Sequence, residues 1–289
     1  MKNILKELRI KQYTKNFLVF AAALFAGKLL VADIIFLNVL AFFAFSFTAS
    51  IVYIINDIMD VEKDRQHPDK CKRPLASGEI SIPFAIGMGV SLFIVVVLMI
   101  SKLNSHFGII LGIYLMMNLL YSWKLKHVVI VDVMIIAFGF VLRALAGVIA
   151  TGVGTTSWFI LCVFMLSLFL ALAKRRHELE LFAEDQGRQR KVLQFYSLSL
   201  IDQLLTIVTA MAITSYSIFA SQADTLSIGG ISFMSLTIPM VVYGMFRYLY
   251  LVHIKKIGGK PEDILLCDKH ILGVVVLYTA TIIFIRNIY

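Results

Sequence analysis

Nine apolar runs of about 20 residues dominate this chain. A helix rises about 1.5 Å per residue, so a run of this length spans the hydrocarbon core of a bilayer. The runs occupy most of the 289 residues. We therefore expect one polytopic membrane domain, residues 1–289, of the all-α class. The predicted spans are 17–36, 37–56, 82–100, 106–123, 128–150, 157–173, 203–221, 230–252 and 270–288.

The composition excludes a soluble globular domain. Hydrophobic residues make up 60% of the chain and charged residues 16%, whereas soluble domains are about half apolar and about a quarter charged. Three cysteines do not provide a disulfide framework. The net charge of +9 could indicate a nucleic-acid partner, but few polar residues separate the apolar runs. The composition therefore indicates membrane lipid, and no nucleic acid, as a partner.

The positive charges predict an orientation. Cytoplasmic segments of membrane proteins carry an excess of Lys and Arg. When the nine spans alternate, 23 of the 27 Lys and Arg residues fall on the side of the N-terminus and three on the opposite side, with Arg143 inside a span. We therefore expect an integral cell (inner) membrane protein with its N-terminus, long loops and active site facing the cytoplasm.

Polar residues gather where the second predicted span ends. Helical periodicity carried past this end places Asn56, Asp60 and Asp64 on one face, with Asp57 three residues before Asp60. Stacked like charges destabilise a helix unless a cation lies between them. Mg²⁺ is commonly held by one or two carboxylates together with substrate phosphates. The pattern predicts a Mg²⁺ site; the alternative is a solvated face neutralised by neighbouring cations.

Cations follow these acids in the same loop. Lys70, Lys72 and Arg73 lie between Pro68 and Pro74, and the prolines stiffen the loop. A metal that bridges phosphate oxygens, with Lys or Arg beside it to neutralise the leaving group, is what diphosphate chemistry needs. The loop therefore predicts a site for a diphosphate substrate.

The acidic motif and its loop resemble the first motif of the UbiA-type intramembrane prenyltransferase superfamily. The number of spans and the long loops after the second and sixth are also similar to that family. The resemblance implies nine transmembrane helices around a central cavity, with functional loops near 57–80, 174–191 and 253–269. It rests first on Asn56-Asp57-x-x-Asp60-x-x-x-Asp64, followed by Lys70-x-x-Arg73-Pro74 and Gly78.

The loop after the sixth span departs from the common family pattern. Most members carry an Asp-x-x-x-Asp motif there for a second Mg²⁺, whereas this chain has Lys174-Arg175-Arg176-His177-Glu178. Replacing acids by cations removes a metal site and adds an anion site, which indicates a phosphorylated acceptor. In this respect the chain resembles the decaprenyl-phosphate phosphoribosyltransferase branch, which joins phosphoribosyl pyrophosphate to a polyprenyl phosphate. Shorter stretches resemble the same branch: 9–16, 132–147, Arg247-Tyr248 and Gly259–Glu262 with Asp268.

The resemblance implies a role for each polar group. We expect Asp57, Asp60 and Asp64 to be catalytic, with Asn56, Asp60 and Asp64 as the Mg²⁺ ligands. The expected substrate-binding residues are Lys15, Tyr53, Lys70 and Arg73 for the donor, and Arg143, Lys174, Arg175, Glu178 and Arg247 for the acceptor and its loops. For Tyr53 the alternative is an interfacial aromatic residue.

Two other functions remain open from the sequence. The first is prenyl transfer from a polyprenyl diphosphate to an aromatic, quinone-precursor acceptor on the same fold; the missing second aspartate pair argues against it. The second is secondary transport of an anion, which requires polar residues along a route to the far side. Spans seven to nine carry almost none, so the sequence favours an enzyme.

Overall fold

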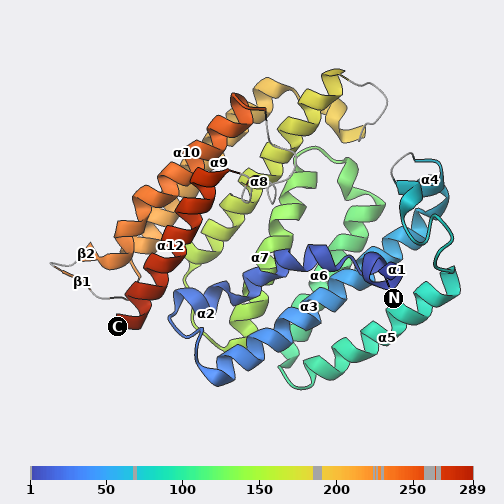
Figure 1. Ribbon diagram of the computed structural model, residues 1–289, viewed down its shortest axis with the longest axis horizontal. Helices are drawn as coiled ribbons and strands as arrows, with labels where there is room; N and C mark the ends of the chain where they lie inside the picture. The colour runs from blue at the N-terminus through green and yellow to red at the C-terminus, as the bar shows by residue number, and fades with distance from the viewer. Residues whose placement is uncertain are drawn as a thin grey trace. The chain divides into compact units, whose positions relative to one another are not determined.

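Helices make up nearly all of the described structure (Figure 1). The computed structural model describes residues 2–67, 70–184, 191–223, 225, 227–228, 231–256, 264 and 268–288. The long helices are α3 (Ala32–Met59), α5 (Ile82–Ile100), α6 (Ser105–Trp123), α7 (Val131–Thr151), α8 (Ser157–Glu184), α9 (Leu198–Ser221), α10 (Ile238–His253) and α12 (Lys269–Ile288).

Short elements connect the long helices. The N-terminal ones are α1 (Lys2–Glu7), the 3-10 helix η1 (Ile10–Phe20) and α2 (Ala21–Phe25). An antiparallel pair of two-residue strands, which the all-α prediction did not include, precedes α10. The remaining elements are α4 (Val61–Arg65), η2 (Lys70–Lys72), η3 (Leu125–His127), η4 (Lys191–Phe195), β1 (Ser227–Ile228), β2 (Ile231–Ser232) and η5 (Phe233–Thr237).

Eight described helical segments are long and apolar enough to cross a membrane, so the predicted count of nine is not confirmed. The difference lies in the predicted span 17–36. That stretch holds the end of η1, all of α2, a turn at Gly27 with φ 69°, and the start of α3 at Ala32. A hydropathy window does not detect a turn inside an apolar run. The other eight predicted spans each correspond to one of these segments, with ends that differ by up to eight residues.

Large apolar side chains remain exposed along the surfaces of these helices. On α5, Phe93 is 56% and Leu98 63% exposed, and on α12 Phe284 is 66% exposed. Contiguous apolar surface of this kind is unusual on a soluble monomer, and lipid tails cover it at no cost in desolvation. Apart from the two short strands, the predicted α-helical membrane fold is therefore confirmed.

The chain divides into two compact units. The first comprises Met1–Ala23, Lys28–Lys124 and Leu142–Gly154. In it α3 lies beside η1, α5 and α6 (Figure 1), and its core includes Val19, Phe45, Phe107 and Ala146.

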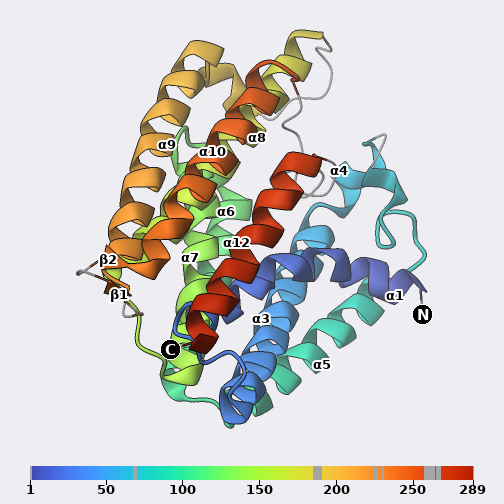
Figure 2. The same cartoon turned by 60° about the vertical axis from the view of Figure 1, so that its left-hand side comes forward.

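The second unit comprises Leu24–Gly27, Leu125–Val141 and Thr155–Tyr289. Its helix α9 packs along α8, and α10 contacts both α9 and α12 (Figure 2). Its core includes Phe169, Leu172, Ile201 and Leu205. The single domain expected from the sequence stays a prediction.

Candidate functional site

The acidic motif lies where α3 gives way to α4 in the first unit. α3 ends at Met59, and Asp60 adopts φ −102° and ψ 7°, which breaks the helix before α4 begins. Asp57 and Asp64 lie on either side of the break, and each of their side chains is 4% exposed. Ionised carboxylates at this burial require cationic partners.

Arg73 is a partner of both acids. Its Nη1 lies 3.0 Å from Asp57 Oδ1 and 2.5 Å from Asp64 Oδ2. Lys70 Nζ lies 3.8 Å from the other Asp64 oxygen. The structure therefore brings together two of the predicted acids and two of the predicted loop cations, and their roles in binding remain predictions.

Arg9 belongs to the same network, and the sequence analysis did not select it. Its Nη2 donates to both oxygens of Asp57, at 2.6 and 2.8 Å. The guanidinium carbon lies 4.6 Å from the centre of the Tyr53 ring. Arg9 has φ 52°, a left-handed conformation that separates α1 from η1. The sequence signal for Arg9 was its position at the start of the 9–16 stretch. From that stretch Lys15, which is half-buried in η1, was predicted to bind the donor.

Asn56 and Asp60 lie outside the contacts that Arg9 and Arg73 make. The Asp60 side chain is 33% exposed, and one of its oxygens lies 3.4 Å from Lys63 Nζ. Its backbone N–H donates to the backbone oxygen of Asn56 one turn earlier. Asn56 Oδ1 is buried and has no hydrogen-bond partner.

These two residues fit a Mg²⁺ ion that substrate phosphates complete. Such an ion usually takes one or two protein oxygens and fills its remaining positions with phosphate and water. Asn56 offers an unpaired oxygen and Asp60 an accessible carboxylate. Asp64, the third predicted ligand, is paired with Arg73 and Lys70, and its role at the metal stays a prediction. Within the described ranges, no three His, Cys, Asp or Glu side chains form a group that could hold a metal by themselves.

Glu7 is a second group that the sequence analysis missed. The residue is 1% exposed, and both carboxylate oxygens are buried without a hydrogen-bond partner. Burial, followed by the negative charge of Asp57, raises its pKa to about 6, while the positive charges of Arg9 and Arg73 act in the opposite direction. No pattern around position 7 marks this residue, because its burial arises from the packing of α1.

We expect Glu7 to make the protein less stable as the pH rises. Its pKa is higher in the folded state than the ordinary 4.5, so the folded state binds the proton more tightly. The folded state then loses about 2 kcal/mol of relative stability in all as the pH rises from well below 4.5 to well above 6. The free energy of unfolding of the Glu7→Gln variant, measured in mixed micelles, should not show this fall with rising pH. Parallel pH profiles for the variant and the wild type would contradict the assignment.

Arg143 in α7 contacts neighbouring elements of the first unit. Its Nε donates to Asn16 in η1 at 2.7 Å, and its Nη2 donates to Tyr114 at 3.0 Å. The guanidinium also lies over the rings of Phe45 and Tyr114. These contacts give an arginine inside a membrane helix polar and aromatic surroundings. The predicted role of Arg143 in binding phosphate stays a prediction.

In the second unit, the predicted basic segment lies near the C-terminal end of α8. Arg175 is 1% exposed and its Nη1 lies 2.5 Å from Glu178. Lys174 is half-buried. The next residue, Arg176, joins three helices because it bonds Glu180 in α8, Asp202 in α9 and the backbone of Val252 in α10. This favours a structural role for Arg176, while Lys174 and Arg175 remain candidates for anion binding.

Arg247 is the other residue of the second unit with a predicted role in substrate binding. Its Nη2 lies 2.8 Å from Asp268, and the hydrogen bond from this guanidinium lowers the pKa of Asp268. The predicted loop stretch Gly259–Glu262 lies outside the described residues, as do residues 185–190 of the predicted loop 174–191.

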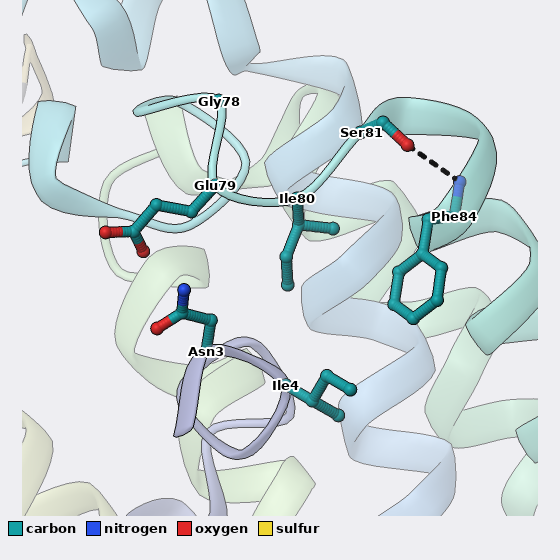
Figure 3. A pocket seen from close by; sticks show the side chains of 7 residues that line it. All are labelled: Asn3, Ile4, Gly78, Glu79, Ile80, Ser81 and Phe84. Atoms are coloured by element: carbon teal, nitrogen blue, oxygen red, sulfur yellow. Dashed lines mark hydrogen bonds between the residues drawn. The ribbon is translucent and has the colours of Figure 1, made fainter. Parts of the chain in front are cut away.

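A pocket of about 510 Å³ in the first unit lies apart from the predicted site residues (Figure 3). Asn3 and Ile4 of α1 line one side, and the segment Gly78–Ser81 with Phe84 lines the other. Figure 3 shows the Glu79 carboxylate beside the Asn3 side chain, and Glu79 itself is exposed. None of the residues assigned a role from the sequence lines this pocket.

A model of the UbiA prenyltransferase family matches residues 16–260. The chain belongs to the UbiA prenyltransferase family. This assignment confirms the resemblance drawn from the acidic motif, and it makes the protein an integral membrane protein and an enzyme of that family.

Similar proteins extend the UbiA match over nearly the whole chain. Decaprenyl-phosphate phosphoribosyltransferase from Corynebacterium glutamicum is 33% identical over 275 residues, which cover 92% of this chain and 81% of that protein. The protein of the same name from Mycobacterium tuberculosis (strain H37Rv) is 30% identical over 284 residues, which cover 96% of this chain and 92% of that protein.

Solved structures agree with the UbiA fold. A UbiA homologue from Archaeoglobus fulgidus bound to GPP and Mg²⁺ superposes with a TM-score of 0.72 at 18% identity, and 99% of each chain is covered. A structure of digeranylgeranylglyceryl phosphate synthase gives 0.70 at 20% identity, with 100% of this chain and 99% of that chain covered. At these identities the likeness concerns the fold.

Proposed function

We propose that this protein transfers a 5-phosphoribosyl group from phosphoribosyl pyrophosphate to a polyprenyl phosphate and releases pyrophosphate. The observation that carries the proposal is the likeness, over more than nine tenths of the chain, to relatives that bear the name decaprenyl-phosphate phosphoribosyltransferase. The cations Lys174 and Arg175 support it, because they stand where a second acidic motif is expected in family members that use a second metal.

The reaction is a displacement at the anomeric carbon of the ribose. A phosphate oxygen of the lipid attacks this carbon, and the bond from the carbon to the pyrophosphate oxygen breaks with its electron pair on the leaving group. The lipid phosphate is anionic at neutral pH, so no strong general base is needed. A single displacement inverts the configuration, and catalysis rests on positioning and on stabilisation of charge.

The first unit supplies the groups for the donor. We propose that Asn56 and Asp60 hold Mg²⁺, which neutralises charge on the diphosphate. Lys15, Lys70 and Arg73 bind the phosphates, since a guanidinium presents paired donors to an anion. Asp57 and Asp64 keep Arg73 oriented until the donor arrives. Tyr53, which lies under Arg9, contacts the ribose.

The acceptor phosphate requires further cations. We propose that Lys174 and Arg175 of the second unit bind it, and that Glu178 orients Arg175 through their ion pair. Arg143 stays a proposed phosphate-binding residue of the first unit. Arg247, which pairs with Asp268, completes the proposed substrate-binding residues of the second unit. We also propose that the polar ends of α3 and α8 face the cytoplasm, because the positive charges concentrate on that side.

The choice of donor tests the function directly. Purified protein in lipid should convert labelled phosphoribosyl pyrophosphate and a polyprenyl phosphate into a labelled lipid, with pyrophosphate released in equal amount. A prenyl diphosphate with an aromatic acceptor should give no product. Product from the second pair alone would contradict the proposal and favour a prenyltransferase; uptake of donor into sealed vesicles without product would indicate transport.

Replacing Asp60 by alanine is expected to reduce Mg²⁺-dependent transfer about a hundredfold or more. The variant removes the accessible carboxylate of the proposed metal site. The matched control is Glu62→Ala. Glu62 lies two residues after Asp60, its side chain is 76% exposed, and its described ion pair is with Arg65, which is 49% exposed. Equal activity of the two variants across a Mg²⁺ titration would remove the proposed metal role of Asp60.

A further inference from the structure

The Glu7 carboxylate is buried beside the donor site without a bond to hold it. It is the last residue of α1, and α1 is fixed on both sides of it: Lys6 Nζ donates to the backbone oxygen of Lys72 at 2.6 Å, and Ser50 Oγ donates to that of Leu8 at 2.8 Å. The carboxylate is therefore held away from water by packing. Because a buried acid without a partner destabilises the fold, its presence calls for a functional explanation.

The arginines near Glu7 form hydrogen bonds with Asp57 and none with Glu7. Asp57 accepts two bonds from Arg9 and one from Arg73, whereas Glu7 accepts none. Yet the charges of Arg9 and Arg73 both act on the Glu7 carboxyl, as does that of Asp57. Arg9 is also only two residues from Glu7 in the chain. One guanidinium thus lies within electrostatic range of two buried carboxylates and bonds one of them.

Donor binding changes the balance between these carboxylates. A divalent cation held by Asn56 and Asp60 would add positive charge within one turn of Asp57 and would weaken the attraction between Asp57 and Arg9. We propose that Glu7 is a positioning residue that accepts the Arg9 guanidinium when a cation-bound diphosphate enters the site. The proposal rests on the proposed function for the identity of the donor, but it requires only that a diphosphate and a divalent cation bind at the acidic motif.

The exchange would couple Glu7 to ligand affinity. In the unliganded protein Glu7 is buried without a partner, and in the liganded protein it gains a charge-assisted hydrogen bond. Part of the affinity for the diphosphate then comes from relief of this unfavourable burial. A purely structural residue would contribute to folding and leave the affinity unchanged.

The test measures binding of Mg²⁺ with inorganic pyrophosphate by calorimetry on the full-length protein. Glu7→Gln is expected to weaken binding about tenfold, the value of one charge-assisted hydrogen bond, without lowering the melting temperature of the unliganded protein. In the Arg9→Gln background the same change should have no further effect, because the two residues act together. Glu79→Gln, an exposed acid next to α1, is the matched control and should bind as the wild type does.

Three outcomes would overturn the proposal. They are wild-type affinity in Glu7→Gln, an equal loss of affinity in the Arg9→Gln background, and a fall in melting temperature that accompanies the loss. If Glu7→Gln does not fold, Glu7→Asp retains the charge with a shorter reach and should lose about threefold in affinity, again only when Arg9 is present. Pyrophosphate is the leaving group of both candidate donors, phosphoribosyl pyrophosphate and a prenyl diphosphate. A failed phosphoribosyl-transfer assay would therefore not affect the binding result for Glu7.

Discussion

Replacing Arg73 by methionine is expected to lower the free energy of unfolding by about 3 kcal/mol or more. Removing one partner of a buried ion pair leaves an uncompensated charge, which costs about 3–5 kcal/mol. The variant removes a cationic partner from two buried carboxylates. Asp57 keeps Arg9, but Asp64 keeps only Lys70 at 3.8 Å among its described ion pairs. Unfolding by SDS in mixed micelles, followed by circular dichroism, measures the loss.

Arg65, the last residue of α4, provides the control for Arg73. Arg65 pairs with Glu62 at 2.8 Å, but both side chains are largely exposed, at 49% and 76%. Such surface pairs contribute about 0–1 kcal/mol, so Arg65→Met should be close to neutral. Adding Asp64→Asn to Arg73→Met should recover part of the stability, because it removes the carboxylate left without a close partner. Equal losses in the two single variants would contradict the proposed role of buried charge.

The sequence predicted the features that depend on local pattern. Apolar length located the long helices, since a span must be apolar whatever it packs against. The spacing placed the loop cations a few residues after the acids; the bond between Arg73 and Asp64 is a contact that the structure adds. The departure at Lys174-Arg175 singled out the branch of the family whose members the comparisons then provided.

Features set by tertiary packing escaped the sequence analysis. Helical periodicity placed Asn56, Asp60 and Asp64 on one face, but Asp60 leaves helical dihedral angles and its described ion pair is with Lys63, whereas Asp64 pairs with Arg73. Arg9 and Glu7 reach the site because α1 packs against the loop after α4, a contact between residues more than sixty positions apart. Neither residue belongs to a periodic pattern, so only the folded structure relates them to Asp57.

Replacing Gly147 by alanine is expected to cost about 3 kcal/mol or more. Gly147 lies in α7, where a Cβ atom would stand 1.8 Å from the backbone oxygen of Val19 in η1. Small residues at helix contacts let backbones approach closely in membranes, and Ala144 and Ala146, both fully buried, share this part of α7. An added methyl group must push η1 away from α7, and overpacking of this kind typically costs 1–3 kcal/mol and occasionally more. Unfolding in mixed micelles measures this loss as well.

Gly112→Ala is the control that distinguishes the effect of this clash from the effect of alanine on helix propensity. Gly112 lies in α6, is exposed, and has nothing within 4 Å of an added Cβ. Alanine there should be neutral or stabilise the protein by up to about 1 kcal/mol, because it reduces backbone freedom without strain. Moving η1 would also displace Asn16 from Arg143, which it bonds at 2.7 Å, so Gly147→Ala should reduce transfer activity as well. If the two glycine variants change stability in the same direction, close backbone contact between η1 and α7 does not constrain this part of the fold.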